Sequence, residues 1–263
     1  MQMNQPVASK TILGIEVNTT SYEDSCDRIQ TWAQNGTSCY VVAANVHVIM
    51  MAQWQRAYRQ VLRQAALVTP DGMPLVIGLR LLGATAQPRV YGPDLMLAWC
   101  ERAAATGLPI YLYGGSEVQL EKLVDFLSHR FPNLLIAGTY SPPYRPLTAA
   151  EVRADGDRIA RSGAKVVFVG LGCPKQEQWM AHQQGFLSAV MIGVGAAFSF
   201  FSGEVAQAPR WMMASGLEWL YRLSREPRRL WRRYLINNPV FLGLFMAQLT
   251  RYHLCLALNR GKK

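Results

Sequence analysis

One acidic residue stands where a parallel sheet would present it to a ligand. Asp71 follows the short apolar run "AALVTP" and lies between Pro70 and Gly72. Proline and glycine around an aspartate are typical of a turn. Asp71 is therefore either a turn residue or a carboxylate at the mouth of a site. The two interpretations are compatible, because α/β sheets bind ligands beyond the carboxyl ends of their strands.

Two junctions between an apolar run and a helical stretch carry glycines that could bind phosphate. "YLYGGSEVQ" contains Gly114 and Gly115, and "VFVGLGCPKQEQ" contains Gly170 and Gly172, with Lys175 just after. Free N–H groups and the positive dipole end of a helix favour phosphate at such places. Neither junction matches the P-loop pattern, so the sequence does not favour an NTPase. Neither matches G-x-G-x-x-G, so a nicotinamide-binding enzyme is only the weaker alternative.

Residues that could bind a metal are scattered along the chain. No pair of cysteines has C-x-x-C spacing, and no histidine has a ligand partner at close spacing; these residues are Cys26, Cys39, Cys100, Cys173, Cys255, His47, His129, His182 and His253. We therefore expect no metal site and no cofactor. Reduced thiols, and an N-terminus without a long apolar stretch behind basic residues, indicate a cytoplasmic protein without a signal peptide.

The elements that must position these residues alternate between two kinds. Strands are predicted for the apolar runs 38–45, 65–70, 109–115, 134–140, 164–172 and 189–200. Helices are predicted for 46–65, 92–107, 116–131, 148–163 and 174–184, with Ser116 and Gln119 spaced as a capping box. Near-continuously apolar strands separated by helices predict an α/β domain with a mainly parallel sheet covered on both faces.

The composition changes near residue 203. Residues 210–263 hold 11 Lys and Arg against 2 Asp and Glu, whereas residues 1–209 hold 16 against 15. We therefore divide the chain into an α/β catalytic domain, 1–203, and a basic helical appendage, 204–263. Such a charge predicts an anionic partner for the appendage.

The appendage pattern favours a membrane surface over nucleic acid. Its arginines alternate with large Trp and Leu side chains; four of them follow a spacing of three, four and three, at Arg222, Arg225, Arg229 and Arg232. They share a helical face only if the helix continues through Pro227, which is more typical of a helix start. The apolar run 240–249 is much shorter than the roughly 20 residues that span a bilayer. We expect an interfacial amphipathic element, with a helical hairpin packed on the body as the alternative.

Several segments together resemble one enzyme family. They are "TPDGMPLV", "RVYGPDLM", "LYGGSEVQLEKL", "VFVGLGCPKQEQWM", "GVGAAFSFFSGEVAQAPRWM" and "GLEWLYRLSREPRRLWRRY", in this order, over about residues 10–240. They resemble the WecG/TagA/CpsF family of bacterial glycosyltransferases. The resemblance implies a Rossmann-like α/β fold with a C-terminal membrane-targeting appendage. It also implies transfer from a UDP-sugar to a polyprenyl-diphosphate-linked sugar, with inversion and without a metal.

The resemblance assigns roles residue by residue. The acid of the P-D-G segment, the proposed general base, is Asp71. The arginine of R-V-x-G-x-D-L is Arg89, the glutamine of P-K-Q-E is Gln176, and the asparagine of T-x-N is Asn45. A lone carboxylate is enough for an inverting transfer, and we expect burial to raise its pKa so that it can act as a base.

Nucleotide and diphosphate contacts are expected from the glycine junctions, the P-K-Q-E segment and the appendage. These residues are Gly114, Gly115, Gly172, Lys175, Glu177, Arg222, Arg229 and Arg232. The chain departs from the family pattern at Ala43, where a threonine is usual, and at Ser199, where an acid is usual. Because these departures concern donor contacts, we expect a hexose donor, glucose before an N-acetylmannosamine-type sugar.

The predicted partners follow from this assignment. They are a UDP-sugar, a polyprenyl-diphosphate-linked sugar and the anionic cytoplasmic face of the inner membrane, with no nucleic acid. The expected role is exopolysaccharide or other cell-surface polysaccharide synthesis. A non-catalytic membrane-surface module and an NAD(P)-dependent oxidoreductase are the alternatives, and a homo-oligomer remains open.

Overall fold

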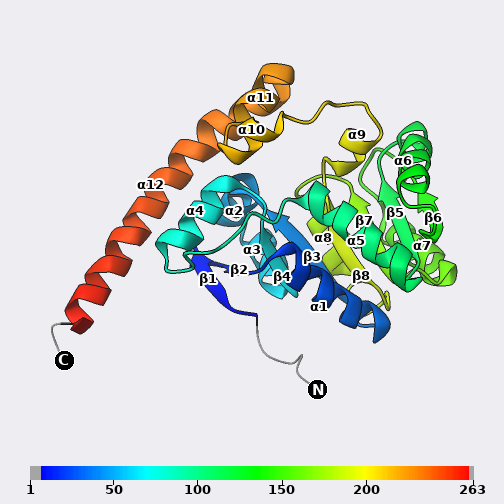
Figure 1. Ribbon diagram of the computed structural model, residues 1–263, viewed down its shortest axis with the longest axis horizontal. Helices are drawn as coiled ribbons and strands as arrows, with labels where there is room; N and C mark the ends of the chain where they lie inside the picture. The colour runs from blue at the N-terminus through cyan, green and yellow to red at the C-terminus, as the bar shows by residue number, and fades with distance from the viewer. Residues whose placement is uncertain (1–6, 261–263) are drawn as a thin grey trace.

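Six apolar segments form one parallel sheet (Figure 1), in the order β4-β3-β8-β7-β5-β6. The computed structural model describes residues 7–260; residues 1–6 and 261–263, the outer ends of the two predicted domains, lie outside the described residues. The strands are β3 (Cys39–Ala44), β4 (Leu67–Pro70), β5 (Ile110–Gly114), β6 (Ile136–Tyr140), β7 (Val166–Gly170) and β8 (Val190–Gly193). The predicted α/β class is confirmed.

Helices cover both faces of this sheet. One face is covered by α2 (Val46–Trp54), α3 (Arg56–Gln64), α7 (Ala149–Ser162) and α8 (Lys175–Gln183). The other is covered by α1 (Tyr22–Gln34), α5 (Gly92–Thr106), α6 (Glu117–Arg130) and α9 (Ala197–Phe201). The helix α4 (Met73–Leu81) follows β4 and joins the first of these layers.

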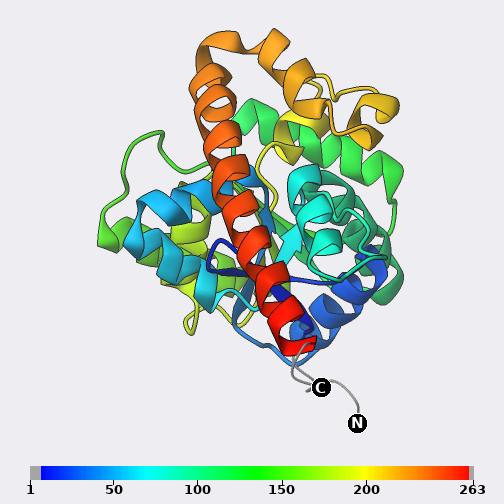
Figure 2. The same ribbon diagram turned by 90° about the vertical axis from the view of Figure 1, so that its left-hand side faces the viewer.

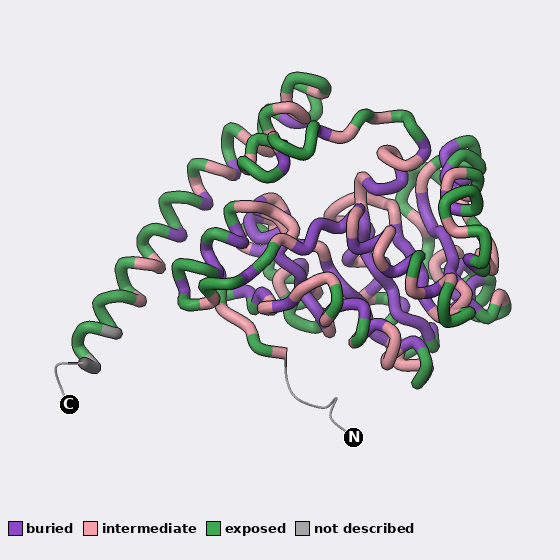
Figure 3. Tube along the Cα trace, in the orientation of Figure 1, coloured by how far each residue is buried: buried purple, intermediate pink, exposed green. Residues whose placement is uncertain are grey.

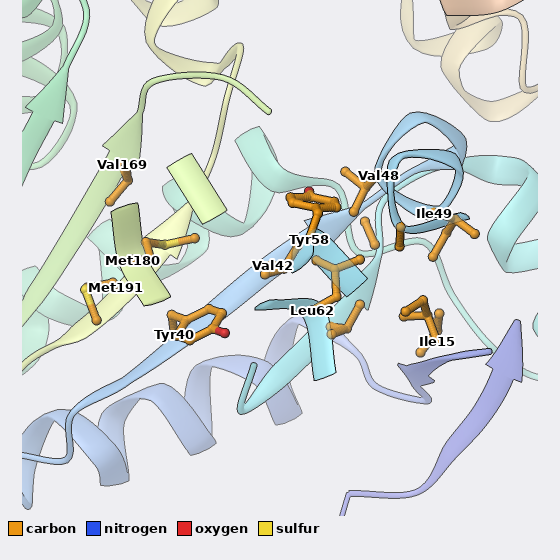
Figure 4. Packing of buried hydrophobic residues seen from close by; sticks show 14 of the residues in the cluster. Ile15, Tyr40, Val42, Val48, Ile49, Tyr58, Leu62, Val169, Met180 and Met191 are labelled. Atoms are coloured by element: carbon orange, nitrogen blue, oxygen red, sulfur yellow. The ribbon is translucent and has the colours of Figure 1, made fainter. Parts of the chain in front are cut away.

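Successive side chains of a strand point to opposite faces of the sheet, so each strand contributes to both layers of the core. In β3, Tyr40 and Val42 belong to the cluster under α2 and α3, whereas Val41 belongs to the opposite cluster. Figure 4 shows Tyr40 and Val42 on the side of Tyr58 and Leu62, which come from α3. Strands buried on both sides must be apolar at every position, which explains why these segments are near-continuous apolar runs.

Three local predictions need correction. The stretch 46–65 is two helices rather than one, because Gln55 adopts an extended conformation with φ −126° and ψ 110°. The predicted strand 189–200 ends at Gly193, and the apolar residues beyond it form α9. A two-stranded hairpin, β1 (Ser9–Ile12) and β2 (Ile15–Asn18), was not predicted. Its turn places Leu13 and Gly14 at positive φ, 48° and 77°.

Up to residue 260 the appendage forms three helices, the last of which packs along the body. They are α10 (Arg210–Ala214), α11 (Glu218–Arg225) and α12 (Pro227–Arg260), so Pro227 begins a new helix as expected. Figure 2 shows α12 running across the molecule, and it contacts α2. Phe241 and Phe245 of α12 are buried in the core beneath it. A Cβ on Gly78 of α4 would lie 3.1 Å from the Phe245 ring, so this glycine makes room for the helix.

The opposite side of α12 is apolar as well. Large apolar side chains are at least 43% exposed at Leu235, Ile236, Leu242, Leu244, Met246, Leu254 and Leu258. Figure 3 shows the buried positions of α12 interrupted by exposed ones along its length. Within residues 7–260, no helix is both long enough and apolar enough to cross a membrane.

Candidate active site

The predicted site residues of the body lie along the carboxyl ends of the strands, on one side of the sheet. Asn45 follows β3 and Asp71 follows β4, while Gly114 ends β5 and Gly115 follows it, and Gly172 lies just after β7. All these strands are parallel, so their carboxyl ends lie on the same side. Neighbouring strands are about 4.8 Å apart, so β4 and β7 are separated by about 14 Å along this edge.

Asp71 is held by backbone and by one side chain. Its own N–H donates to the carbonyl oxygen of Ala44 at 2.8 Å, which fixes the turn after β4. Its Oδ1 accepts the N–H of Gly92 at 2.9 Å, and Asn45 Nδ2 donates to its Oδ2 at 3.4 Å. Oδ2 therefore has only one long hydrogen bond and is the oxygen with capacity for another donor.

The surroundings of Asp71 raise its pKa. Burial is the main cause, because it disfavours the charged carboxylate. The nearby Arg89 guanidinium lowers the pKa, Glu218 raises it, and the hydrogen bonds from Gly92 and Asn45 lower it, with a net rise. The expected direction of this shift is confirmed.

Arg89 connects the turn of Asp71 to the appendage. Its Nε donates to the backbone oxygen of Asp71 at 2.5 Å, and its Nη2 lies 2.6 Å from Oε2 of Glu218 in α11. The guanidinium also stacks over the Tyr91 ring at 4.2 Å. Arg89 therefore lies beside the predicted base, but its hydrogen bonds do not go to the base's carboxylate.

A pocket opens between this edge of the body and the appendage. The body contributes Asn45, Val46, His47, Asp71, Gly72, Met73, Pro74 and Arg89. The appendage contributes Met213, Gly216, Glu218, Trp219, Arg222, Arg233, Tyr234 and Asn238. The acid predicted as the base therefore shares a pocket with basic groups that lie about 150 residues later in the chain.

Only one of the three predicted appendage arginines lines this pocket. Arg222 does so, and its enclosed Nε has no hydrogen-bond partner. Arg229 instead pairs with Glu226 at 2.6 Å, and Arg232 stacks over the Trp231 ring at 5.2 Å; both arginines are exposed. The prediction is corrected for these two residues, because they lie on the exposed side of α12, whereas Arg233, Tyr234 and Asn238 are the residues of this helix that line the pocket.

Arg233 takes the place that Arg229 and Arg232 were expected to have. Its Nη2 donates to Asn45 Oδ1 at 3.3 Å, while its enclosed Nε has no partner. Burial lowers the pKa of this guanidinium, and the neighbouring charge of Arg222 lowers it further. Arg233 lies on the same side of α12 as Asn237 and Phe241, which follow it by four and eight residues and are buried.

A neutral histidine lies in the same pocket. Asn237 Nδ2 is 3.1 Å from Nδ1 of His47, which joins α12 to the first turn of α2. Burial, together with the charge of Arg233, lowers the pKa of His47 to about 4. His47 is therefore neutral near pH 7, with Nδ1 accepting from Asn237 and its proton on Nε2.

The first glycine junction lines a second, larger opening. Gly115, Ser116 and Lys175 lie in a groove of about 1690 Å³ over the ends of β5, β6 and β7. Ser116 caps α6 by accepting the Gln119 N–H at 3.2 Å. The Gln119 side chain donates to Ser199 and Glu204 instead of completing the capping box. This groove combines a helix N-terminus with a lysine, which suits a diphosphate.

Two other glycines have structural roles. A Cβ on Gly114 would lie 2.8 Å from the backbone of Gly170, so close approach of β5 and β7 requires glycine there. Gly172 does not line the groove, and its N–H donates to Gln176 Oε1 at 3.2 Å. These two positions shape the loops, whereas Gly115 faces the groove.

The last two residues of the P-K-Q-E segment are buried. Gln176 lies over the end of β8, where a Cβ on Gly193 would meet its Nε2 at 2.9 Å. Gln176 Nε2 donates to Glu177 Oε1 at 2.7 Å, and Glu177 is fully buried. The prediction that Glu177 contacts the nucleotide is therefore wrong, because no part of its side chain reaches the surface.

The two departures from the family pattern lie at different places in the fold, and neither residue is among those that line the pocket or the groove. Ala43 is in β3 next to Gly92, where a Cβ would approach that of Ala43 to 3.2 Å. Ser199 accepts a hydrogen bond from Gln119 at 3.1 Å, beside the groove. Among residues 7–260, no group of three or more His, Cys, Asp or Glu side chains is arranged to hold a metal ion. All five cysteines are free thiols.

Comparison with known proteins gives a consistent match. The sequence model of the "Glycosyl transferase WecG/TagA/CpsF family" matches residues 10–254. A protein of Bacillus spizizenii is 33% identical over 206 residues, 78% of each chain. One of Bacillus subtilis is 33% identical over 225 residues, 84% of each chain. One of Staphylococcus aureus is 29% identical over 238 residues, 89% of this chain and 91% of its own. All three are named N-acetylglucosaminyldiphosphoundecaprenol N-acetyl-beta-D-mannosaminyltransferase.

Proposed function

The chain belongs to the WecG/TagA/CpsF family of glycosyltransferases, and from this we propose that it moves a hexose from a UDP-sugar to a polyprenyl-diphosphate-linked sugar. It is thus a glycosyltransferase, not the oxidoreductase or non-catalytic module that the sequence left open. The observation that carries the proposal is the pocket that joins Asp71 to Arg222 and Arg233. It combines one carboxylate with cationic groups from the appendage.

Asp71 would act as the general base of a single displacement. Its Oδ2 takes the proton of the acceptor hydroxyl while that oxygen attacks the anomeric carbon and the bond to UDP breaks. One displacement inverts the configuration at that carbon and needs no second carboxylate. A positioned base typically contributes 10²–10⁴-fold to the rate. The raised pKa of Asp71 supports this role, since a carboxyl group with an ordinary pKa is a weak base near pH 7.

Cationic groups would stabilise the diphosphate that leaves. Arg222 and Arg233 lie in the pocket with Asp71, and Lys175 lies in the groove over β5 and β7. Preorganised donors of this kind stabilise charge that develops in the transition state, which supports a reaction without a metal. The donor would lie along the strand ends, with its nucleotide near Gly115 and its sugar towards Asp71.

The identity of the transferred sugar rests on two opposed indications. The names of the relatives favour N-acetylmannosamine, with an N-acetylglucosamine-diphosphoundecaprenol acceptor. The replacements at Ala43 and Ser199 favour a different hexose, with glucose first. The proposed role is therefore cell-surface polysaccharide synthesis, with exopolysaccharide the favoured product.

The outer side of α12 would hold the enzyme on the cytoplasmic face of the inner membrane. Its exposed apolar side chains include Leu235, Leu242 and Met246, and basic residues such as Arg228 and Arg232 flank them. A basic residue near an anionic surface contributes about 1 kcal/mol to binding. In this proposal 204–263 remains an appendage, although the inner side of α12 is part of the core.

One assay tests the proposal. Membranes that carry labelled polyprenyl-diphosphate N-acetylglucosamine are incubated with UDP-glucose, UDP-N-acetylmannosamine and other UDP-sugars, with and without a chelator. We expect one donor to extend the lipid, unaffected by the chelator. Asp71→Asn should abolish extension and still bind UDP. Extension by this variant at the wild-type rate would refute the assignment of the base.

A further inference from the structure

Glu218 of α11 contacts the machinery of the body across the domain boundary. Its Oε2 accepts from Arg89 at 2.6 Å, and its Oε1 accepts from the Tyr91 hydroxyl at 3.1 Å. The side chains of Arg89 and Glu218 are only 17% and 13% exposed, so water screens this pair poorly. It is therefore more than an ordinary surface ion pair.

The Glu218 contact determines where the charge of Arg89 is directed. Arg89 Nε donates to the backbone oxygen of Asp71, and its Nη2 donates to Glu218. None of its hydrogen bonds goes to the Asp71 carboxylate, although the two residues are close enough for Arg89 to act on that carboxylate electrostatically. If Glu218 were absent, the nearest anion for this guanidinium would be the proposed base.

We propose that Glu218 is a positioning residue for the transfer reaction: it holds the Arg89 guanidinium away from the Asp71 carboxylate and leaves that carboxylate free to accept the acceptor's proton. This inference rests on the proposed function, in which Asp71 is the base. It assigns to the segment "GLEW", residues 216–219, a role in catalysis that is separate from binding the donor or the lipid.

The other ionisable groups around Asp71 do not replace Glu218. Arg233 and Arg222 are positive, and His47 is neutral near pH 7. Tyr91 and Tyr22 face this region as neutral phenols, since burial raises the pKa of both. Among the described residues that line the pocket, Glu218 is the acid other than Asp71.

The consequence for the base has a definite sign. The negative charge of Glu218 disfavours ionisation of Asp71 and so raises the pKa of that carboxyl group. Removing it should lower the pKa, because the Arg89 charge is then no longer neutralised. One neighbouring cation typically lowers a carboxyl pKa by about 1–3 units. Base strength thus depends on α11 being in place.

The test follows Asp71 itself in the full-length protein. The chain is labelled with ¹³C-carboxyl aspartate, and the Asp71 signal is assigned by its loss in Asp71→Asn. Its titration is then compared in the wild type, Glu218→Gln, Glu218→Asp and the control Glu226→Gln. Glu226 is an acid of the same appendage that pairs with the exposed Arg229 instead. Thermal melting establishes that each variant is folded.

We expect the Asp71 titration to move down by about one pH unit in Glu218→Gln and to stay in place in Glu226→Gln. Glu218→Asp keeps the negative charge, so the Asp71 titration in this variant should stay close to that of the wild type. The acid limb of kcat/KM, measured with UDP-glucose and UDP-N-acetylmannosamine both supplied, should move in the same direction, and kcat at neutral pH should fall by at most about tenfold.

An unchanged Asp71 titration in Glu218→Gln would overturn the inference, and so would the same shift in Glu226→Gln. These outcomes are distinct from failure of the proposed function. If Asp71→Asn keeps full transfer activity, then Asp71 is not the base, whatever its titration shows.

Discussion

Replacing Arg233 with methionine should weaken catalysis and stabilise the fold. The guanidinium is enclosed between α12 and Asn45, its Nε has no partner, and burial lowers its pKa. It also lies near a second cation, Arg222. Asp71 lies near enough to favour this charge but accepts no hydrogen bond from it, and burying an ion costs several kcal/mol even after relaxation. Because burial of the Arg233 guanidinium is so unfavourable, we expect this group to have a function, which is to bind an anion.

The magnitudes follow from these contacts. Loss of one preorganised donor to a developing charge lowers kcat by about 10²–10³-fold. Methionine fills a similar length with apolar atoms, so we expect a gain of about 1–2 kcal/mol in the free energy of unfolding. In a chain of this size, 1 kcal/mol raises Tm by about 2–4 °C. Transfer to the labelled lipid acceptor gives the rate, and thermal melting followed by circular dichroism gives Tm.

Arg229→Met is the matched control. It removes the same charge from the same helix, but Arg229 is exposed and its pair with Glu226 contributes at most about 1 kcal/mol. We expect Tm and kcat close to those of the wild type. The reasoning about the pocket would be refuted if Arg229→Met lost as much activity as Arg233→Met. A lower Tm in Arg233→Met would show instead that the guanidinium stabilises the docked helix.

Further predictions concern the two sides of α12, a buried histidine and a glycine. Leu242→Glu, on the exposed side, should reduce binding to anionic vesicles in a sedimentation assay without changing Tm, whereas Phe245→Ala, on the buried side, should lower the free energy of unfolding by about 3 kcal/mol. The pKa of His47 is about 4 in the folded protein and about 6.5 in the unfolded chain. Between these two pH values only the unfolded chain binds a proton at His47, so the free energy of unfolding of the wild type should fall as the pH drops from 6.5 towards 4. Urea denaturation should show a smaller fall in His47→Gln, and an equal fall would contradict the assignment. Gly114→Ala should lower the free energy of unfolding by about 2–3 kcal/mol, because φ is +113° and the new Cβ would lie 2.8 Å from the backbone of Gly170 in β7. Gly163→Ala is the control: φ is +73° there and no atom lies within 4 Å of the new Cβ, so the same assay should show a loss of only about 1 kcal/mol.

The sheet could be predicted because each central strand is buried on both faces. Such strands must be apolar at every position, so the runs at 39–44 and 166–170 are visible without any structure. The same signal misleads at 189–200, where the apolar run continues from β8 into α9. Hydrophobicity alone does not distinguish a buried strand from a buried helix segment.

The body half of the site was also predictable, whereas in the appendage half only Arg222 was predicted. Asn45 and Asp71 directly follow two adjacent strands, and the ends of these strands can be predicted from the sequence. The positions of Glu218 and Arg233 depend on how α11 and α12 are arranged on the two sides of the break before Pro227, and on which side of α12 faces the body. Because both sides of α12 are apolar, the hydrophobic pattern does not show which arginine points inwards. That choice is made by long-range packing, such as Phe245 against Gly78.

The strand order has a consequence for how the chain acquires its fold. β8 is the last strand in the sequence, yet it lies between β3 and β7 and joins them. Until residue 193 has been synthesised, β4 with β3 and β7 with β5 and β6 are two half-sheets, each with an unpaired inner edge. Insertion of a late strand between two early halves makes many contacts distant in sequence, which slows folding and exposes edges that can pair with other chains. The row of strand ends runs across this seam from Ala44 of β3 to Gly170 of β7, so the side of the sheet that carries the proposed site is continuous only when β8 is in place.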